Sequence, residues 1–360
     1  MAATTSGDDR VAVVALASLP GMGPARLRRL MDIDGPAGAW RRLLAGDRNA
    51  LAAAGCARPP EEGHAESAWR RCQASGVTVL APGDDLWPRR LLADPEPPAV
   101  LFTTGPVPDG PAVAVVGTRR CSGYGRRVAG LLGAGLAAAG VGVVSGVATG
   151  IDAAAQRAAL DAGGAAVTGV VGSGLDVVYP ARNRALWSDL AARGVLVSEA
   201  PPGARPLPWR FPARNRIIAA LADVVVVVES GAAGGSMHTV EAAQQRGRPV
   251  MAVPGPITAA TSAGTNRLLA EGCAPVCDLE DVLVAVGLER ASAGAGDPAA
   301  AEPVDGGARR LLEDLGWEPA SVDELVLRSG LALAEVTGGL ATLATRGVVR
   351  DVGGWWERVR

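Results

Sequence analysis

The middle of the chain, from Val77 to about residue 285, alternates short runs of Val, Ala and Leu with glycine loops and amphipathic helical stretches. This alternation is typical of βαβ units, which build a parallel sheet. Strands are predicted at 113–116, 142–144, 166–171, 195–197, 224–228 and 250–253, and helices near 126–139, 152–162, 183–193 and 239–246. We therefore expect an α/β fold, a Rossmann-like doubly wound parallel sheet whose binding loops lie beyond the carboxyl ends of the strands.

Smaller units are predicted on either side of this α/β unit, which spans residues 77–287. Residues 1–76 contain short helices with breaks such as Pro20-Gly21, so we expect a small N-terminal helical domain of the helix-hairpin-helix or SAM-like type. Residues 306–360 contain three helical stretches and two β-like runs, which indicates a C-terminal winged-helix-like domain. Residues 288–305 lack hydrophobic periodicity and are predicted to be a linker.

Two local features leave alternatives open. The turn Gly21-Met22-Gly23 either points backbone N–H groups at a DNA phosphate or only packs two helices together. In the tail, the helical stretch that would read DNA carries one basic residue, Arg346, so protein contact and DNA contact are both open there.

The charge and cysteine content limit the possible functions. The chain has no lysine and a net charge of −2, so a nucleic-acid surface has to be a local patch of arginines. The five cysteines form no CxxC pair and the chain has two histidines, so we expect no metal site. The N-terminus does not resemble a signal peptide and no apolar run reaches about 18 residues, so we expect a cytoplasmic protein without membrane contact.

Glycine-rich loops that suit phosphate follow several of the predicted strands. In Gly117-Thr118-Arg119-Arg120-Cys121-Ser122-Gly123, the glycines and Ser122 can cap a helix and leave N–H groups free for an anion, while Arg119 supplies charge. The spacing is not that of a dinucleotide fingerprint, so we expect no nicotinamide cofactor. Similar loops are Gly172-Ser173-Gly174, which leads on to Arg182-Asn183, and Gly234-Gly235-Ser236. Each loop alone is compatible with a structural role, but several aligned loops can follow a polymer.

The stretch 211–218 contains Arg214-Asn215-Arg216 just before an apolar helical run. Three anion-seeking side chains at a helix entrance predict a phosphate site, and we expect Arg119 and Arg214 to contact phosphate and not the core. Asp152, Asp176 and Glu199 are interpreted as helix caps or charge partners, and His238 as structural. No catalytic residue is therefore predicted.

In order along the chain, Gly117-Thr118-Arg119, Ser145-Gly146, Gly172-Ser173-Gly174, Arg214-Asn215-Arg216 and Val253-Pro254-Gly255 resemble the motifs of the DNA-processing protein A (Smf) family. The resemblance covers residues 78 to about 278. It implies a cytoplasmic protein that binds single-stranded DNA, protects it and helps load the RecA recombinase in natural transformation or recombination. It implies a homodimer, and neither catalysis nor a cofactor.

Carried over by motif position, the resemblance implies the following strand-facing residues: Arg119, Ser122, Gly123, Gly172, Ser173, Gly174, Arg182, Asn183, Arg214, Asn215, Arg216, Gly235 and Ser236. Because the chain has few aromatic residues, we expect contacts to the DNA backbone to dominate over base stacking. Two positions depart from the family pattern: Gln156 stands where the family often has histidine, and His238 where it is usually apolar.

The region 239–270 combines a late helix, a strand at the sheet periphery and the apolar pair Leu268-Leu269, so we expect a dimer contact there that overlaps a RecA surface. Two other functions stay open. The loop before Glu241 resembles that of nucleotide phosphoribohydrolases, in which this glutamate would act on the ribose of a nucleoside monophosphate. The second alternative function is a nucleotide-sensing scaffold without DNA affinity.

Overall fold

The computed structural model describes residues 7–288, 306–316 and 319–358, which fall into two compact units on either side of the gap at 289–305. The predicted linker at 288–305 therefore lies outside the described residues, apart from Leu288. We describe each unit by itself. None of the helices within these ranges has the length and apolar character that a membrane crossing requires.

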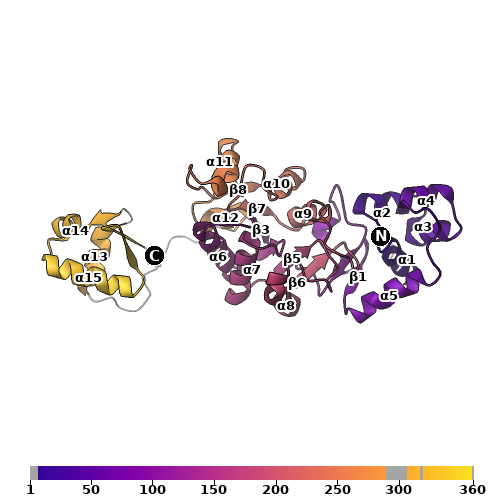
Figure 1. The fold of residues 1–360 in the computed structure, drawn as a ribbon, viewed down its shortest axis with the longest axis horizontal. Coiled ribbons are helices and arrows are strands. Elements are labelled where there is room, and N and C mark those ends of the chain that lie inside the picture. Colours follow the sequence, from indigo (N-terminus) through magenta and orange to yellow (C-terminus); the bar gives the residue numbers. More distant parts are fainter. Residues whose placement is uncertain (1–6, 289–305, 317–318, 359–360) are drawn as a thin grey trace. The chain divides into compact units, whose positions relative to one another are not determined.

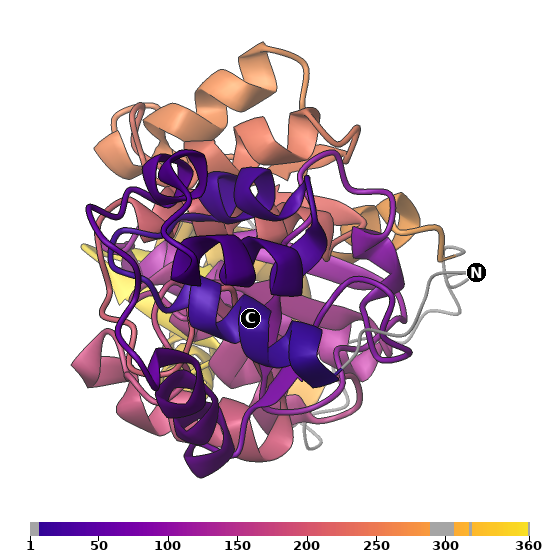
Figure 2. The same ribbon diagram turned by 90° about the vertical axis from the view of Figure 1, so that its right-hand side faces the viewer.

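The larger unit begins with the predicted group of helices, which lie together in Figure 2 and belong to the same compact unit as the sheet. Their bounds are α1 (Gly7–Ala17), α2 (Pro24–Met31), α3 (Gly35–Leu44), α4 (Arg48–Ala54) and α5 (His64–Ala74). Helix α1 is almost wholly apolar after its first turn, and its Val13, Val14 and Leu16 are completely buried. It packs against α3 and α5, which cover its apolar surface.

A nine-stranded sheet follows, with the order β1-β2-β6-β5-β4-β3-β7-β8-β9. The strands are β1 (Thr78–Leu80), β2 (Leu101–Thr103), β3 (Ala112–Val116), β4 (Gly142–Ser145), β5 (Val167–Val171), β6 (Val195–Ser198), β7 (Val224–Val227), β8 (Val250–Ala252) and β9 (Ala274–Pro275). The six predicted strands are β3 to β8, all parallel, which confirms the doubly wound fold. The strand order reverses between β3 and β7, where such sheets bind ligands.

Helices cover both faces of the sheet (Figure 1). One face carries α6 (Gly123–Ala138), α7 (Ile151–Ala162), α8 (Arg184–Arg193) and α12 (Leu279–Ala285), and the other carries α9 (Arg210–Ala220), α10 (Met237–Gln244) and α11 (Ala263–Ala270). Within β3, Val113 and Val115 belong to the core on the side of α6 and α7, whereas Ala112, Ala114 and Val116 belong to the core on the side of α9 and α10. Successive side chains of a strand point to opposite faces, so every residue of this central strand is buried.

The smaller unit has the winged-helix arrangement that the sequence predicts. Its elements are α13 (Gly306–Leu315), β10 (Ala320–Ser321), α14 (Val322–Ser329), α15 (Leu333–Thr345), β11 (Val349–Val352) and β12 (Trp355–Arg358), and the strands form an antiparallel sheet in the order β10-β12-β11. Ser321 and Glu324 form a capping box that starts α14, and Gly330, with φ of +66°, ends it.

Candidate nucleic-acid interface

The largest hollow near the switch point is a cavity of about 660 Å³ at the carboxyl ends of β3 and β7, which we call the switch-point cavity. Its walls come from the loop after β3, the loop before α10 and the first turns of α9. The predicted site residues that line it are Arg119, Arg214, Asn215, Gly235 and Ser236. Five of the predicted residues, from two loops and helix α9, therefore meet at one place.

Arg119 stands over an aromatic pair at the edge of this cavity. Its guanidinium carbon lies 5.4 Å from the ring centre of Phe211, and the ring centre of Tyr179 lies 5.4 Å from that of Phe211. A smaller cavity of about 180 Å³ shares Arg119, Tyr179 and Phe211 with the switch-point cavity and includes the exposed Arg182. Such stacked arrangements hold an arginine over a ring while leaving its N–H donors available.

Phe211 and Tyr179 are functional candidates that the sequence analysis missed. The chain has two phenylalanines and two tyrosines, and one of each lines the switch-point cavity. Low aromatic content therefore did not mean that the site lacks aromatic surface. Their position in the sequence could have pointed to them, because both residues stand directly before prolines inside the family motifs.

The Arg214-Asn215-Arg216 triplet does not stand at a helix entrance, as expected, but in the second turn of α9. The helix begins at Arg210, four residues before Arg214. Pro212 does not prevent this, because the first turn of a helix does not use its backbone N–H groups for internal hydrogen bonds. The three side chains consequently point in three directions.

Arg214 points towards the sheet and is 7% exposed. Its Nη1 donates hydrogen bonds to the carbonyl oxygen of Gly146, at 2.6 Å, and to that of Val170. Burial raises the pKa of the neighbouring Asp152 carboxyl, and the charge of Arg214 opposes that shift. The side chain thus joins the ends of two strands, and the expectation that Arg214 avoids the core is wrong.

Arg216 does not line the switch-point cavity. Its Nη2 lies 2.5 Å from Oε1 of Glu199, and its Nη1 donates to the carbonyl oxygen of Glu96 at 2.7 Å. Burial raises the pKa of Glu199, and Arg216 opposes the shift. Asn215, between the two arginines, lines the cavity and donates from Nδ2 to the carbonyl oxygen of Gly235 at 3.3 Å.

The Gly172-Ser173-Gly174 loop also lies away from this cavity. A Cβ on Gly174 would lie 2.6 Å from the carbonyl oxygen of Pro201, so this glycine allows the segment after β6 to pack closely. The Ser173 hydroxyl donates to the carbonyl oxygen of Val177, and Asn183 donates from Nδ2 to that of Val147. These residues shape the loops, and their contact with DNA stays a prediction.

The loop with Ser122 and Gly123 is tied to the strand next to it. Ser122 caps α6 by accepting from Gly125, and both its N–H and its hydroxyl donate to the Glu229 carboxylate. The first N–H groups of α6 are thus partly used within the protein. By contrast, Ser236, which precedes α10, makes no side-chain cap for that helix.

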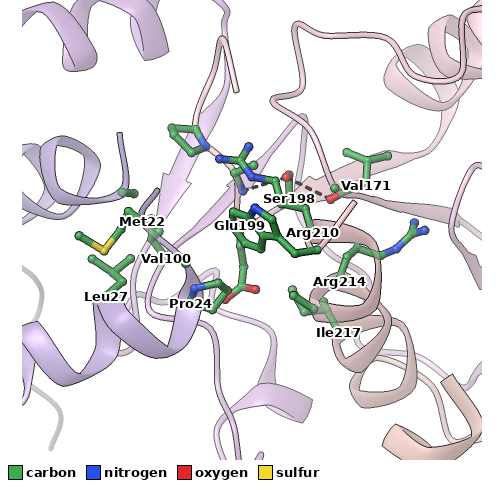
Figure 3. Close-up of a pocket in the computed structure, with 17 residues that line it drawn as sticks. Met22, Pro24, Leu27, Val100, Val171, Ser198, Glu199, Arg210, Arg214 and Ile217 are labelled. Atoms are coloured by element: carbon green, nitrogen blue, oxygen red, sulfur yellow. Dashed lines mark hydrogen bonds between the residues drawn. The ribbon is translucent and has the colours of Figure 1, made fainter. Parts of the chain in front are cut away.

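A second, smaller pocket of about 40 Å³ lies between α2 and α9 (Figure 3). Met22, Pro24 and Leu27 face it from the helical group, and Ile217 from α9. A Cβ on Gly23 would lie 3.5 Å from the ring of Trp209, so the Gly21-Met22-Gly23 turn packs closely against that side chain. The pocket is far smaller than a typical ligand site of about 300–1,000 Å³.

The geometry does not favour the phosphoribohydrolase alternative. Glu241, on α10, is exposed, lies 3.5 Å from Nδ1 of His238 and faces a separate cleft beside α2. It does not line the switch-point cavity, where a nucleotide ribose would lie. In the parts of the chain that the structure describes, no cluster of His, Cys, Asp and Glu could hold a metal ion.

Leu268 of the predicted dimer contact is 4% exposed and belongs to the core of its own chain, whereas Leu269 is partly buried. The strand of this region, β8, is not the edge, because β9 pairs with it. Of the two leucines, Leu269 is the better placed to reach a partner.

Comparisons with known proteins agree with this fold. A family model described as DNA recombination-mediator protein A matches residues 78–287, and a model of the DprA winged helix domain matches residues 295–354. Protein Smf of Escherichia coli is 36% identical over 294 residues, covering 78% of this chain and 77% of that protein.

Two solved structures are similar in fold. DNA processing protein A (DprA) from Streptococcus pneumoniae has a TM-score of 0.62 and 31% identity, covering 78% of this chain and 98% of that one. DNA processing protein A from Helicobacter pylori, studied for its single-stranded DNA binding mode, has a TM-score of 0.51 and 29% identity, covering 58% of this chain and 94% of that one.

Proposed function

The chain belongs to the DNA recombination-mediator protein A family, and from this premise we propose that it binds single-stranded DNA in the switch-point cavity. The observation that carries the proposal is Arg119, which is exposed at the cavity over Phe211 and has no carboxylate partner among the described residues. An arginine held in this way can bind a phosphate, and the exposed ring of Tyr179, beside the half-buried ring of Phe211, can stack on bases. The relative from Helicobacter pylori supports this substrate.

We place the strand along Arg119, Asn215 and the start of α10 at Gly235-Ser236, which has no side-chain cap, with Arg182 at the end of the smaller cavity. Backbone N–H groups at a helix start bind phosphate, and the aromatic pair tolerates any base. In this proposal Arg214 supports the cavity wall and Arg216 pairs with Glu199 outside the cavity, so neither contacts the strand. Weak sequence preference follows, because neither phosphate contacts nor stacking distinguish bases.

In this proposal the protein is a recombination mediator in the cytoplasm and has no catalytic step and no cofactor. It protects single strands and helps RecA to assemble on them, during recombination or natural transformation. The support for the RecA role is the family to which the chain belongs. RecA assembly on strands covered by single-strand-binding protein, with and without this protein, tests that role, and equal rates would contradict it.

We also propose that the protein acts as a homodimer through a surface that includes Leu269 and overlaps the RecA surface. Two cavities in one dimer raise the effective concentration for a long strand. Leu269→Arg should therefore give a monomer by light scattering and lose affinity for long oligonucleotides more than for short ones. A dimeric variant, or a monomer that keeps the full preference for long strands, would place the interface elsewhere.

The site is proposed to lie within residues 77–287 and not in the winged-helix unit. A fragment of residues 1–287 should keep its affinity for single strands, because the described residues before and after 289–305 form separate compact units. A folded fragment that binds no single-stranded DNA would place the main site in the tail.

The decisive experiment for the function pairs two assays on the whole chain. Fluorescence anisotropy compares labelled single-stranded DNA with duplex, and a second assay follows base release from a nucleoside monophosphate. We expect tight binding of the single strand without base release. Base release without DNA binding would select the hydrolase. If the protein showed neither activity, the nucleotide-sensing scaffold would be the remaining function.

A further inference from the structure

In doubly wound sheets, the helix after the first central strand commonly receives a phosphate at its N-terminus. In this protein that helix is α6, and a side chain of the protein already occupies the position. The Glu229 carboxylate, which comes from the end of β7 across the switch point, accepts a hydrogen bond from Ser122 N at 2.8 Å. It also accepts from the Ser122 hydroxyl at 2.5 Å and from the Thr261 hydroxyl at 3.4 Å.

The space beside Ser122 at this helix start is also filled. Glu229 is 2% exposed, and a Cβ added to Gly125 would lie 2.3 Å from its Oε2. The backbone closes the same junction, because Thr118 N donates to the carbonyl oxygen of Glu229 at 2.7 Å. Glu229 thus fixes both ends of the loop that carries Arg119.

We propose that Glu229 is a built-in anion that determines specificity: it stands where a free phosphate would bind at α6 and closes this position to small phosphates. The loop of residues 118–122 is then held with its arginines outward, towards a strand in the cavity. The part of the proposal that concerns DNA rests on the function proposed above. The part that concerns small anions does not depend on it.

Two substitutions separate the space that Glu229 fills from the charge it carries. Glu229→Ala leaves the Ser122 N–H and hydroxyl facing a void of carboxylate size, whereas Glu229→Gln keeps the shape. The Gln oxygen can accept from Ser122 N, and its amide can donate to the hydroxyls of Ser122 and Thr261, which are able to accept. The Gln variant should therefore fold. The matched control is Glu241→Gln, an exposed carboxylate on α10.

The first measurement is the thermal midpoint, Tm, in rising concentrations of formate and inorganic phosphate. We expect these anions to raise the Tm of Glu229→Ala more than that of the other proteins. The wild type, Glu229→Gln and Glu241→Gln should show the same small change in Tm with anion concentration. Equal stabilisation of the wild type would overturn the proposal, as would a folded Glu229→Ala protein that responds no more than the wild type. If Glu229→Ala folds only with formate present, that requirement is itself the predicted rescue.

The second measurement is the affinity for single-stranded DNA. Without the internal negative charge, the start of α6 attracts anions more strongly, so Glu229→Gln should bind single strands about twofold to fivefold more tightly. Glu241→Gln should change the affinity for single-stranded DNA less than Glu229→Gln does. An affinity of Glu229→Gln at or below that of the wild type would contradict the charge part of the proposal. A wild type that binds no DNA would refute the proposed function, and the anion titration would still decide the role of Glu229.

Discussion

Oε1 of Gln156 accepts a hydrogen bond from the backbone N–H of Val147 at 3.2 Å, and Val147 is a non-glycine residue with φ of +55°. A β-branched residue in this left-handed region is strained, so the surrounding structure has to hold it there. Gln156 is completely buried, and its Nε2 donates to the carbonyl oxygens of Thr168, at 3.0 Å, and Ser145, at 3.4 Å. One amide therefore fixes the loop that leads to Ala148 in the cavity wall.

Gln156→Met should destabilise the protein by about 2–4 kcal/mol, because methionine fills the space but removes the acceptor for the N–H of Val147 and a donor to two buried carbonyl oxygens. Urea denaturation measures the change. Gln244→Met on the exposed side of α10 is the matched control and should change stability by less than about 0.5 kcal/mol. Similar stability of the two variants would show that this amide is not needed to hold the loop.

Arg214→Met should unfold the protein more easily, by about 3–5 kcal/mol, because it leaves Asp152 as an uncompensated buried carboxyl group. Adding Asp152→Asn should recover part of the loss, since no charge then remains at the site. A double-mutant cycle by chemical denaturation measures this coupling. Additive losses would show that the two side chains do not interact.

The strands were predictable because each is a short apolar run bordered by a loop that contains glycine, and burial on both faces removes the need for polar alternation. The role of Arg214 could not be predicted, because it depends on the residue at which α9 begins. Because α9 begins about one turn earlier than expected, Arg214 points towards the sheet and binds carbonyl oxygens there, instead of standing at the helix entrance. Glu229 and Ser122 are 107 positions apart, and their contact follows from the pairing of β3 with β7, which no local pattern contains.

Arg119→Ala should weaken the binding of single-stranded DNA by about 1.5–3 kcal/mol on every sequence, because it removes a charge-assisted contact to phosphate. The fold should be unaffected, since this side chain is exposed. Anisotropy titrations at several salt concentrations should also show a slope of log affinity against log salt that is smaller by about 0.7.

Arg89→Ala is the control for Arg119. Arg89 is an exposed arginine near Asp109, which precedes β3, so it lies at the opposite end of the sheet from the cavity. It should leave DNA affinity close to that of the wild type. Equal losses for the two variants would mean that binding depends on overall charge and not on the cavity.

Tyr179→Leu should weaken the binding of single-stranded DNA by about 1–3 kcal/mol through the loss of base stacking. Tyr124→Leu is closely matched, because Tyr124 is also 41% exposed but does not line the switch-point cavity. An abasic oligonucleotide isolates the effect, since it offers phosphates without rings. If Tyr179→Leu lost equal affinity for the normal and the abasic strand, its effect would not come from stacking.

Cys72 gives a prediction about stability at high pH. Burial, together with the charge of Asp176, raises the pKa of its thiol from 9.0 to about 11, although Arg71 opposes the shift. The folded protein then keeps a proton that the unfolded chain loses, so this stabilising contribution is complete below about pH 9 and is lost as the pH rises to about 11. The free energy of unfolding should therefore fall across this range more steeply in the wild type than in Cys72→Ala. Parallel curves for the two proteins would contradict the raised pKa, and at pH 8 an alkylating reagent should label the exposed Cys277 well before Cys72.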